Sequence, residues 1–171
     1  YWVEQYHIDG FRFDLMGLLD TGLMENLQKE LDNRYGIGEK LVYGEPWRAA
    51  DTAAKNVTLC DKNALKKIDG RIGAFCDDTR DAVKGSVMDE MSRGFVNGGG
   101  LSAEKLACCV RGWAGDWGDF TAPSQTITYL SSHDDWTLWD KLVCTLDPQR
   151  DFAGCDERIL RANRLAFAIL A

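Results

Sequence analysis

The segment His7–Gly17 (HIDGFRFDLMG) places two charged side chains where the sequence otherwise predicts a strand. Successive strand side chains face opposite sides, so Arg12 and Asp14 share one face while Phe11 and Phe13 share the other. Arg12 and Asp14 are therefore adjacent. Either they are an ion pair at the strand end, or Asp14 is a catalytic carboxylate that the guanidinium of Arg12 keeps ionised. Burying an ion pair costs desolvation energy that apolar residues avoid. We therefore expect the pair to serve more than stability.

Two further acids stand at the ends of predicted strands. Glu45 follows the short apolar run 41–44, and Asp134 follows His133 after the run 126–131. Taken singly, Asp14 could be a helix cap, Glu45 a surface acid before a proline, and the His-Asp pair a capped loop. In parallel α/β folds, however, the carboxyl ends of the strands form one rim. The joint placement of the three acids therefore predicts a shared site.

Two carboxyl groups that flank a bond can hydrolyse a glycoside, because one protonates the leaving oxygen while the other attacks the anomeric carbon or activates water. Asp14 suits the nucleophile, since the adjacent arginine favours its ionised form. Glu45 suits the acid, since the neighbouring Pro46 and Trp47 can partly desolvate it. Aromatic rings at such a rim offer flat faces on which sugars stack; the candidates are Trp47, Trp136 and Trp139.

The elements that must position these residues alternate between strands and helices. A helix is predicted after Asp20 or Thr21, with its end at Gly36, and another over 157–171. The Gly-rich connection 94–124 is long enough to carry a helix of its own or to be a functional loop. The alternation predicts parallel βα units. The predicted strands are Ile8–Phe13, Leu41–Gly44, Arg71–Cys76 and Thr126–Ser131.

Composition restricts the class of protein. The 171 residues are 45% hydrophobic and 27% charged, as in globular proteins, and no apolar run approaches the roughly 20 residues of a membrane span. A net charge of −7 argues against a nucleic-acid partner, which requires clustered Lys and Arg. The six cysteines form no CxxC pair, so we expect free thiols. The chain begins at Tyr1 without a methionine or signal-like segment, and localisation is therefore not predicted.

Three sequence blocks resemble the α-amylase superfamily and, in detail, its type I pullulanases. The blocks are HIDGFRFDLMG, YGEPW and YLSSHDDWTLWDKL, and the intervening KGSVMDEMSRGFVNG is also similar to pullulanases. The resemblance implies a (β/α)₈ TIM barrel, of which residues 1–171 would be a fragment of the catalytic domain, from about the fourth strand through the helix before the eighth. It implies retaining hydrolysis of α-1,6 branch linkages in pullulan, amylopectin, glycogen or limit dextrins.

Position by position, the resemblance assigns roles to named residues. It implies that Asp14 is the nucleophile, Glu45 the general acid/base and Asp134 the stabiliser of the transition state. It also implies that Arg12 orients the nucleophile and that other residues contact the sugar. No cofactor is implied, although a full-length parent could hold a structural calcium ion. The expected partner is a branched α-glucan, without nucleic acid or membrane; the implied sugar contacts are Trp47 and His133, with Asp135 beside them.

One position departs from the family pattern, and other interpretations remain open. The family usually has His-Asp-Asn where this chain has Asp135 as the third residue, and the added carboxylate repels Asp134. One alternative is another α-glucan hydrolase of the superfamily, and another is a non-catalytic carbohydrate-binding fragment. A third is a metal-dependent hydrolase with Asp14, Glu45, His133 and Asp134 as ligands, although no local metal-binding spacing is present.

Overall fold

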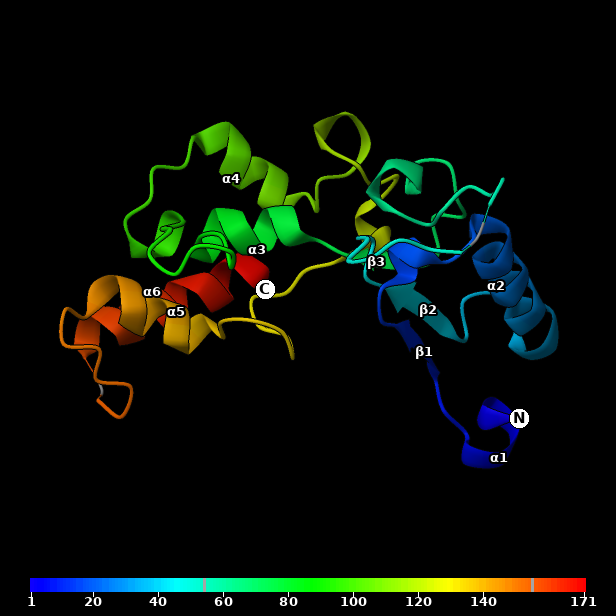
Figure 1. Cartoon of the computed structure of the whole chain (residues 1–171), viewed down its shortest axis with the longest axis horizontal. Helices are drawn as coiled ribbons and strands as arrows, with labels where there is room; N and C mark the ends of the chain where they lie inside the picture. The colour runs from blue at the N-terminus through cyan, green and yellow to red at the C-terminus, as the bar shows by residue number, and fades with distance from the viewer. Residues whose placement is uncertain (54, 155) are drawn as a thin grey trace. The chain divides into compact units, whose positions relative to one another are not determined.

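The computed structural model describes residues 1–53, 55–154 and 156–171. The chain divides into two compact units. The first unit comprises Tyr1–Phe75 and Ala114–Ile127, and the second comprises Cys76–Trp113 and Thr128–Ala171. The strands lie in the first unit and most of the longer helices in the second (Figure 1).

The first unit contains a four-stranded sheet in the order β1-β2-β3-β4, with every pair parallel. The register sets Phe13 beside Gly44, so the residues that follow β1 and β2 emerge next to each other. The prediction of parallel strands is confirmed, and the α/β class with it. The strands are β1 (Gly10–Phe13), β2 (Leu41–Gly44), β3 (Ile72–Phe75) and β4 (Thr126–Ile127).

The fourth strand is shorter than predicted. We expected it to continue to Ser131, but its pairing with β3 ends at Ile127. Beyond that residue the chain enters the second unit, where Leu130 is buried in a helical core. The apolar run that resembles one strand therefore contributes to two different cores.

Helix α2 (Thr21–Tyr35) starts after Asp20 and ends at Gly36, as predicted. It buries Met24 and Leu31 and is in contact with β3. Gly36 has φ 108°, a conformation that favours glycine and ends the helix. The first unit also contains α1 (Trp2–Tyr6) and short 3₁₀ turns, η1 (Met16–Leu18), η2 (Lys62–Ala64), η4 (Gly115–Trp117) and η5 (Pro123–Gln125).

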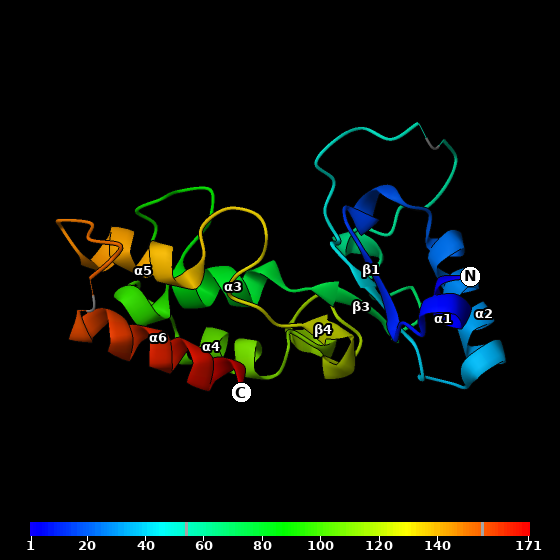
Figure 2. The same ribbon diagram turned by 90° about the horizontal axis from the view of Figure 1, so that it is seen from below.

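The second unit is built from helices. Its elements are α3 (Asp77–Lys84), η3 (Phe95–Asn97), α4 (Ala103–Val110), α5 (Leu138–Leu146) and α6 (Glu157–Leu170), which lie side by side in Figure 2. Helix α4 confirms that the long connection carries a helix of its own. The core of the unit includes Val83, Leu130, Leu142, Val143 and Ile159.

Helix α6 confirms the predicted terminal helix, but not all of its apolar residues are buried. Ile159, Ala162 and Ala166 are buried, whereas Leu165 and Phe167 are 44% and 59% exposed. The apolar residues of this helix therefore extend beyond the stripe that the second unit covers.

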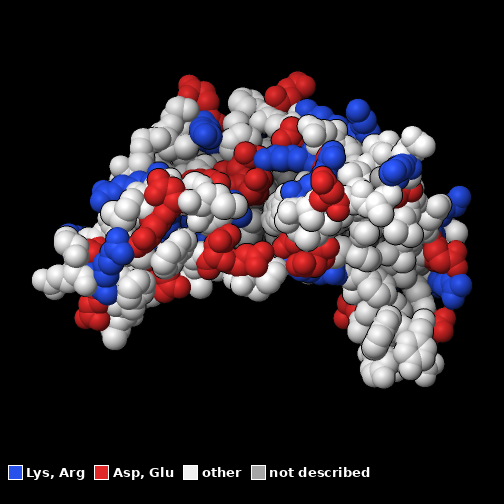
Figure 3. Space-filling view, viewed as in Figure 1, with Lys and Arg blue, Asp and Glu red and all other residues white. Residues whose placement is uncertain are grey.

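The cysteines agree with the sequence analysis where the structure describes them. Cys60, Cys76, Cys108, Cys109 and Cys144 are free and buried, whereas Cys155 lies outside the described residues. None of the described helices is long and apolar enough to cross a membrane. On the face drawn in Figure 3, acidic and basic side chains are interspersed over the described residues of both units.

Candidate active site

Arg12 joins two of the predicted catalytic acids. Its Nη1 donates to Oδ1 of Asp14 over 2.6 Å, and its Nη2 donates to Oε1 of Glu45 over 2.5 Å. These residues come from β1 and from the ends of β1 and β2, which the parallel register places side by side. A carboxylate oxygen of Asp14 lies within 4.8 Å of one of Glu45. The predicted contact between Arg12 and Asp14 is confirmed; the contact with Glu45 is additional.

The carboxylate of Glu45 is enclosed by its neighbours. The residue is 2% exposed, and its Oε2 accepts a hydrogen bond of 2.7 Å from the backbone N–H of Leu15. Leu15 adopts a left-handed conformation with φ 47°, which is uncommon for a residue other than glycine. Strained backbone of this kind occurs preferentially at functional sites. Both oxygens of Glu45 are therefore acceptors held by fixed donors.

Asp14 has the opposite environment. Its side chain is 61% exposed, whereas that of Arg12 is 29% exposed. The sequence analysis considered the cost of burying Arg12 and Asp14, but the buried acid in the structure is Glu45. The physical reason is that Asp14 lies beyond the last paired residue of β1, where neighbouring strands no longer cover it.

The guanidinium of Arg12 is also in contact with an aromatic ring. Its central carbon lies 5.6 Å from the ring centroid of Phe75, the last residue of β3, in a cation–π arrangement. Burial disfavours the charged form of Arg12, but the hydrogen bond to Asp14 and the charges of Glu45 and Asp14 outweigh it and raise its pKa. Arg12 is therefore a permanent cation between two acids. The sequence analysis missed Phe75 and Leu15, because the former depends on strand register and the latter acts through its backbone.

Trp47 lies two residues after Glu45 in the sequence. It is half-buried, and its backbone is in contact with Gly17, where an added Cβ would collide with the Trp47 carbonyl. The backbone N–H of Gly17 donates to the carbonyl of Glu45 over 2.9 Å. The DLMG and GEPW segments are thus packed backbone to backbone. Next along the chain, a cavity of about 540 Å³ is lined by residues that include Arg48, Asp61, Asn63 and Lys67.

The remaining predicted site residues belong to the second unit. His133, Asp134 and Asp135 are exposed, and Nε2 of His133 lies 3.5 Å from Oδ1 of Asp134. Asp135 has a left-handed backbone with φ 57°. That these residues join Asp14 and Glu45 in one site stays a prediction.

The tryptophans that follow this loop differ in their surroundings. Trp136 is half-buried, whereas Trp139 packs against the core of the second unit. Trp139 therefore contributes to the packing of α5 against this core.

Comparison with known proteins places these observations in a family context. No protein-family model matches the chain. The pullulanase of Bacillus subtilis (strain 168) is 38% identical over 175 residues, which cover 99% of this chain and 23% of that protein. The resemblance to pullulanases is confirmed. The chain spans 13% to 26% of the length of the pullulanases that it matches.

Solved pullulanase structures agree with the sequence match. The type I pullulanase of Bacillus subtilis str. 168, complexed with maltose, gives a TM-score of 0.84 at 35% identity, over 99% of this chain and 23% of that chain. The apo pullulanase of Paenibacillus barengoltzii gives a TM-score of 0.84 at 34% identity, over 98% of this chain and 25% of that chain. The α/β architecture is therefore that of the corresponding pullulanase segments.

Proposed function

We propose that the chain is part of the catalytic domain of a retaining glycoside hydrolase that cleaves α-1,6 branch linkages in α-glucans. The observation that carries the proposal is the group formed by Arg12, Asp14 and Glu45 at the ends of two adjacent parallel strands. Retaining glycosidases place their two carboxyl groups about 5–5.5 Å apart, whereas inverting enzymes leave roughly 6.5–9.5 Å for a water molecule. The carboxylate oxygens within 4.8 Å support the retaining geometry.

In this proposal Asp14 is the nucleophile. Its exposed carboxylate can reach an anomeric carbon, and the guanidinium of Arg12 pairs with it and orients it. The attack would form a glycosyl-enzyme ester and break the bond to the leaving oxygen. Asp134 would stabilise the positive charge that develops on the sugar. The proposed sugar contacts are Trp47, His133 and Asp135.

Glu45 is the proposed acid and base. It would protonate the leaving oxygen and then remove a proton from the water that hydrolyses the ester. Its Oε1 accepts a hydrogen bond from Arg12, and its Oε2 accepts one from the backbone N–H of Leu15. A proton on Oε1 would face a donor, so the contact with Arg12 must loosen when Glu45 acts as acid. Substrate binding beside Asp14 would supply that rearrangement.

The proposed fold is a partial (β/α)₈ barrel, about its fourth strand through the helix before its eighth. Four parallel strands in sequential order support it. So does an open apolar cavity of about 310 Å³ on the sheet, lined by residues that include Val42, Tyr43, Phe75 and Ile127. In a closed barrel, inward-facing side chains from the remaining strands fill this space. Residues 1–171 would then be a fragment of the catalytic domain.

The substrate class is proposed from the relatives. A Paenibacillus barengoltzii pullulanase structure holds maltohexaose and α-cyclodextrin, and the Bacillus subtilis structure holds maltose. We therefore propose that this chain contacts branched α-glucans such as pullulan, amylopectin, glycogen or limit dextrins. Hydrolysis insensitive to a chelator is expected, because Arg12 already supplies the cation between the two carboxylates.

The test uses the full-length protein that carries this chain. Asp14→Asn is expected to reduce release of reducing sugar from pullulan to the detection limit, because the nucleophile is lost. Glu45→Gln is expected to lower turnover of pullulan by about 10²–10⁴-fold but to spare aryl glycosides whose leaving groups need no proton. Asp9→Asn, at a 92% exposed side chain, is the matched control and should retain wild-type turnover.

Four outcomes would contradict the proposal. Near-normal turnover of Asp14→Asn would exclude Asp14 as nucleophile, and a first product of inverted anomeric configuration, measured by NMR, would exclude retention. Glucan binding without any hydrolysis by the wild-type protein would favour a binding module instead. Loss of hydrolysis on addition of a chelator, with the protein still folded by its Tm, would favour the metal-dependent alternative.

A further inference from the structure

Two lysines of the second unit are buried. Lys84, the last residue of α3, is 1% exposed, and Lys141, in α5, is 0% exposed. Lysines are almost never fully buried unless they are paired, because removing an ammonium group from water is costly. The hydrogen-bond acceptors that the structure gives for these two ammonium groups are backbone carbonyls. Each lysine therefore holds a backbone segment in place.

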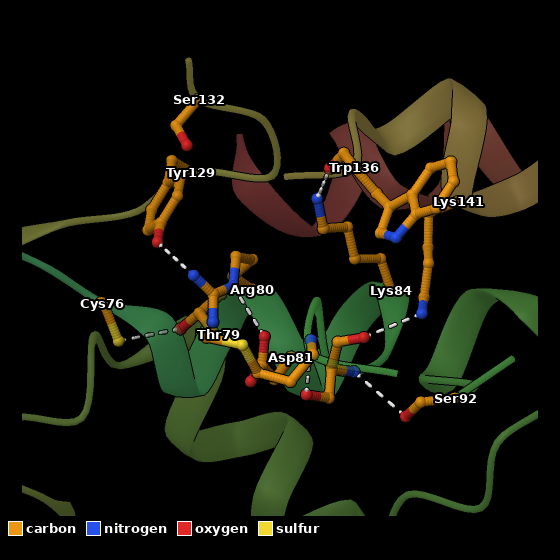
Figure 4. A network of polar contacts seen from close by, with 12 residues as sticks. Cys76, Thr79, Arg80, Asp81, Lys84, Ser92, Tyr129, Ser132, Trp136 and Lys141 are labelled. Atoms are coloured by element: carbon orange, nitrogen blue, oxygen red, sulfur yellow. Dashed lines mark hydrogen bonds and ion pairs between the residues drawn. The ribbon is translucent and has the colours of Figure 1, made fainter. Parts of the chain in front are cut away.

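Lys84 holds the segment that follows the predicted catalytic loop. Its Nζ donates to the carbonyl oxygen of Trp136 over 2.5 Å (Figure 4). Trp136 comes directly after His133, Asp134 and Asp135. A hydrogen bond from a charged donor is about twice as strong as one between neutral groups. The carboxyl end of the loop is thus fixed to α3.

A second contact closes the same loop. The backbone N–H of Leu138 donates to Oγ of Ser131 over 2.8 Å, so the two ends of the segment 131–138 meet. Between these ends His133, Asp134 and Asp135 are exposed, and Asp135 holds a left-handed conformation. Such a conformation is strained and persists only where the surroundings impose it. The loop therefore depends on its two anchors.

Lys141 makes the reciprocal arrangement. Its Nζ donates to the carbonyls of Ser86 over 2.8 Å and Glu90 over 3.0 Å, and also to that of Asp89. These carbonyls lie on the loop that follows α3. Each lysine thus holds the loop attached to the other lysine's helix. The chain therefore contains a matched control: an equally buried lysine that fixes a different loop.

The electrostatics show what this arrangement costs. Burial lowers the pKa of Lys84 to about 8, and the positive charges of Arg80 and Lys141 act in the same direction, whereas Asp81 and Asp135 act against it. Burial also lowers the pKa of Lys141. An apolar residue of similar volume would avoid this cost and is often as stable or more stable. The ammonium of Lys84 is therefore retained at an energetic cost.

We propose that Lys84 is a positioning residue that fixes the His133–Asp134–Asp135 loop for catalysis. The part of this inference that concerns catalysis rests on the proposed function, because it takes Asp134 as the stabiliser of the transition state. The part that concerns the loop rests on the hydrogen bond to Trp136 and on the exposure of the three residues before it.

Hydrogen exchange of the full-length protein tests the loop directly. Lys84→Met is expected to raise the exchange rate of peptides that cover 131–137 by about tenfold, because the loop loses an anchor. Lys141→Met is expected to raise exchange over 86–91 and to leave 131–137 unchanged. Unchanged exchange over 131–137 in folded Lys84→Met would overturn the proposal. Lys84→Gln, whose uncharged donor is one atom shorter, replaces the methionine variant if that variant does not fold.

Kinetics test the link to catalysis. Lys84→Met is expected to lower kcat on pullulan about tenfold with KM changed less than about twofold, and to have little effect in an Asp134→Asn background, since coupled residues are not additive. Equal losses in Lys84→Met and Lys141→Met, in proportion to their Tm, would overturn the positioning role. A wild-type protein that does not hydrolyse pullulan would refute the proposed function, while hydrogen exchange would still decide the loop anchor.

Discussion

One guanidinium serves two carboxylates in the first unit, and this arrangement needs the fork geometry of arginine. Arg12→Lys is expected to lower kcat on pullulan by about 10–100-fold with little change in KM, because the single nitrogen of lysine cannot hold two carboxylates at the separate positions of the two guanidinium nitrogens. Arg34→Lys is the control, since Arg34 is 57% exposed and pairs with Glu4 and Glu30. Steady-state kinetics with Tm as the stability reference measure the effect. Wild-type kcat in Arg12→Lys would show that the bridge is not needed.

Sequence reasoning predicted part of this group. The two-residue period of a strand predicts that Arg12 lies beside Asp14, and the structure confirms that contact. The contact with Glu45 depends on which residue of β2 lies opposite each residue of β1, and that register is a tertiary property. The contribution of Leu15 is a backbone N–H, which any residue except proline carries. Side-chain patterns therefore could not identify it.

At the scale of elements, the close approach of η1 to the turn after β2 requires glycine. A Cβ on Gly17 would collide with the backbone of Trp47, and overpacking of this kind typically costs about 1–3 kcal/mol. Gly17→Ala is expected to lower the free energy of unfolding by that amount and to lower turnover. Gly100→Ala, where nothing lies within 4 Å of the added Cβ, should change stability by less than about 0.5 kcal/mol. Denaturant unfolding of both variants decides the comparison.

The elements themselves were largely predictable, and their misjudged parts share one cause. Helix α2 and strand β2 agree with the sequence because their periodicity and bounding residues point to one structure. The run 126–131 was misjudged, and the exposure of Leu165 and Phe167 in α6 was not predicted, because hydrophobicity does not say which core a residue joins. Leu130 packs with helices rather than with strands.

At the scale of the whole molecule, the sequence predicted an α/β chain but gave no sign that it divides into two units. The division separates the predicted site residues: Arg12, Asp14, Glu45 and Trp47 lie in the first unit, and His133, Asp134 and Asp135 in the second. Residue spacing along a chain carries no information on such a division, because the boundary near Phe75 falls between a strand and the helix after it.

The buried thiols allow the opening rate of each unit to be measured. Cys60 lies in the first unit and Cys76, Cys108, Cys109 and Cys144 in the second, and burial raises the pKa of Cys60 to about 12 and that of Cys76 to about 11. Because alkylating reagents attack the thiolate, each cysteine should be modified only when its own unit opens. After Cys155→Ser, peptide mapping of alkylated protein over time is expected to give one rate for Cys60 and another shared by the second unit. A single common rate would mean that the units open together. The buried cysteines therefore report the rate at which each unit opens.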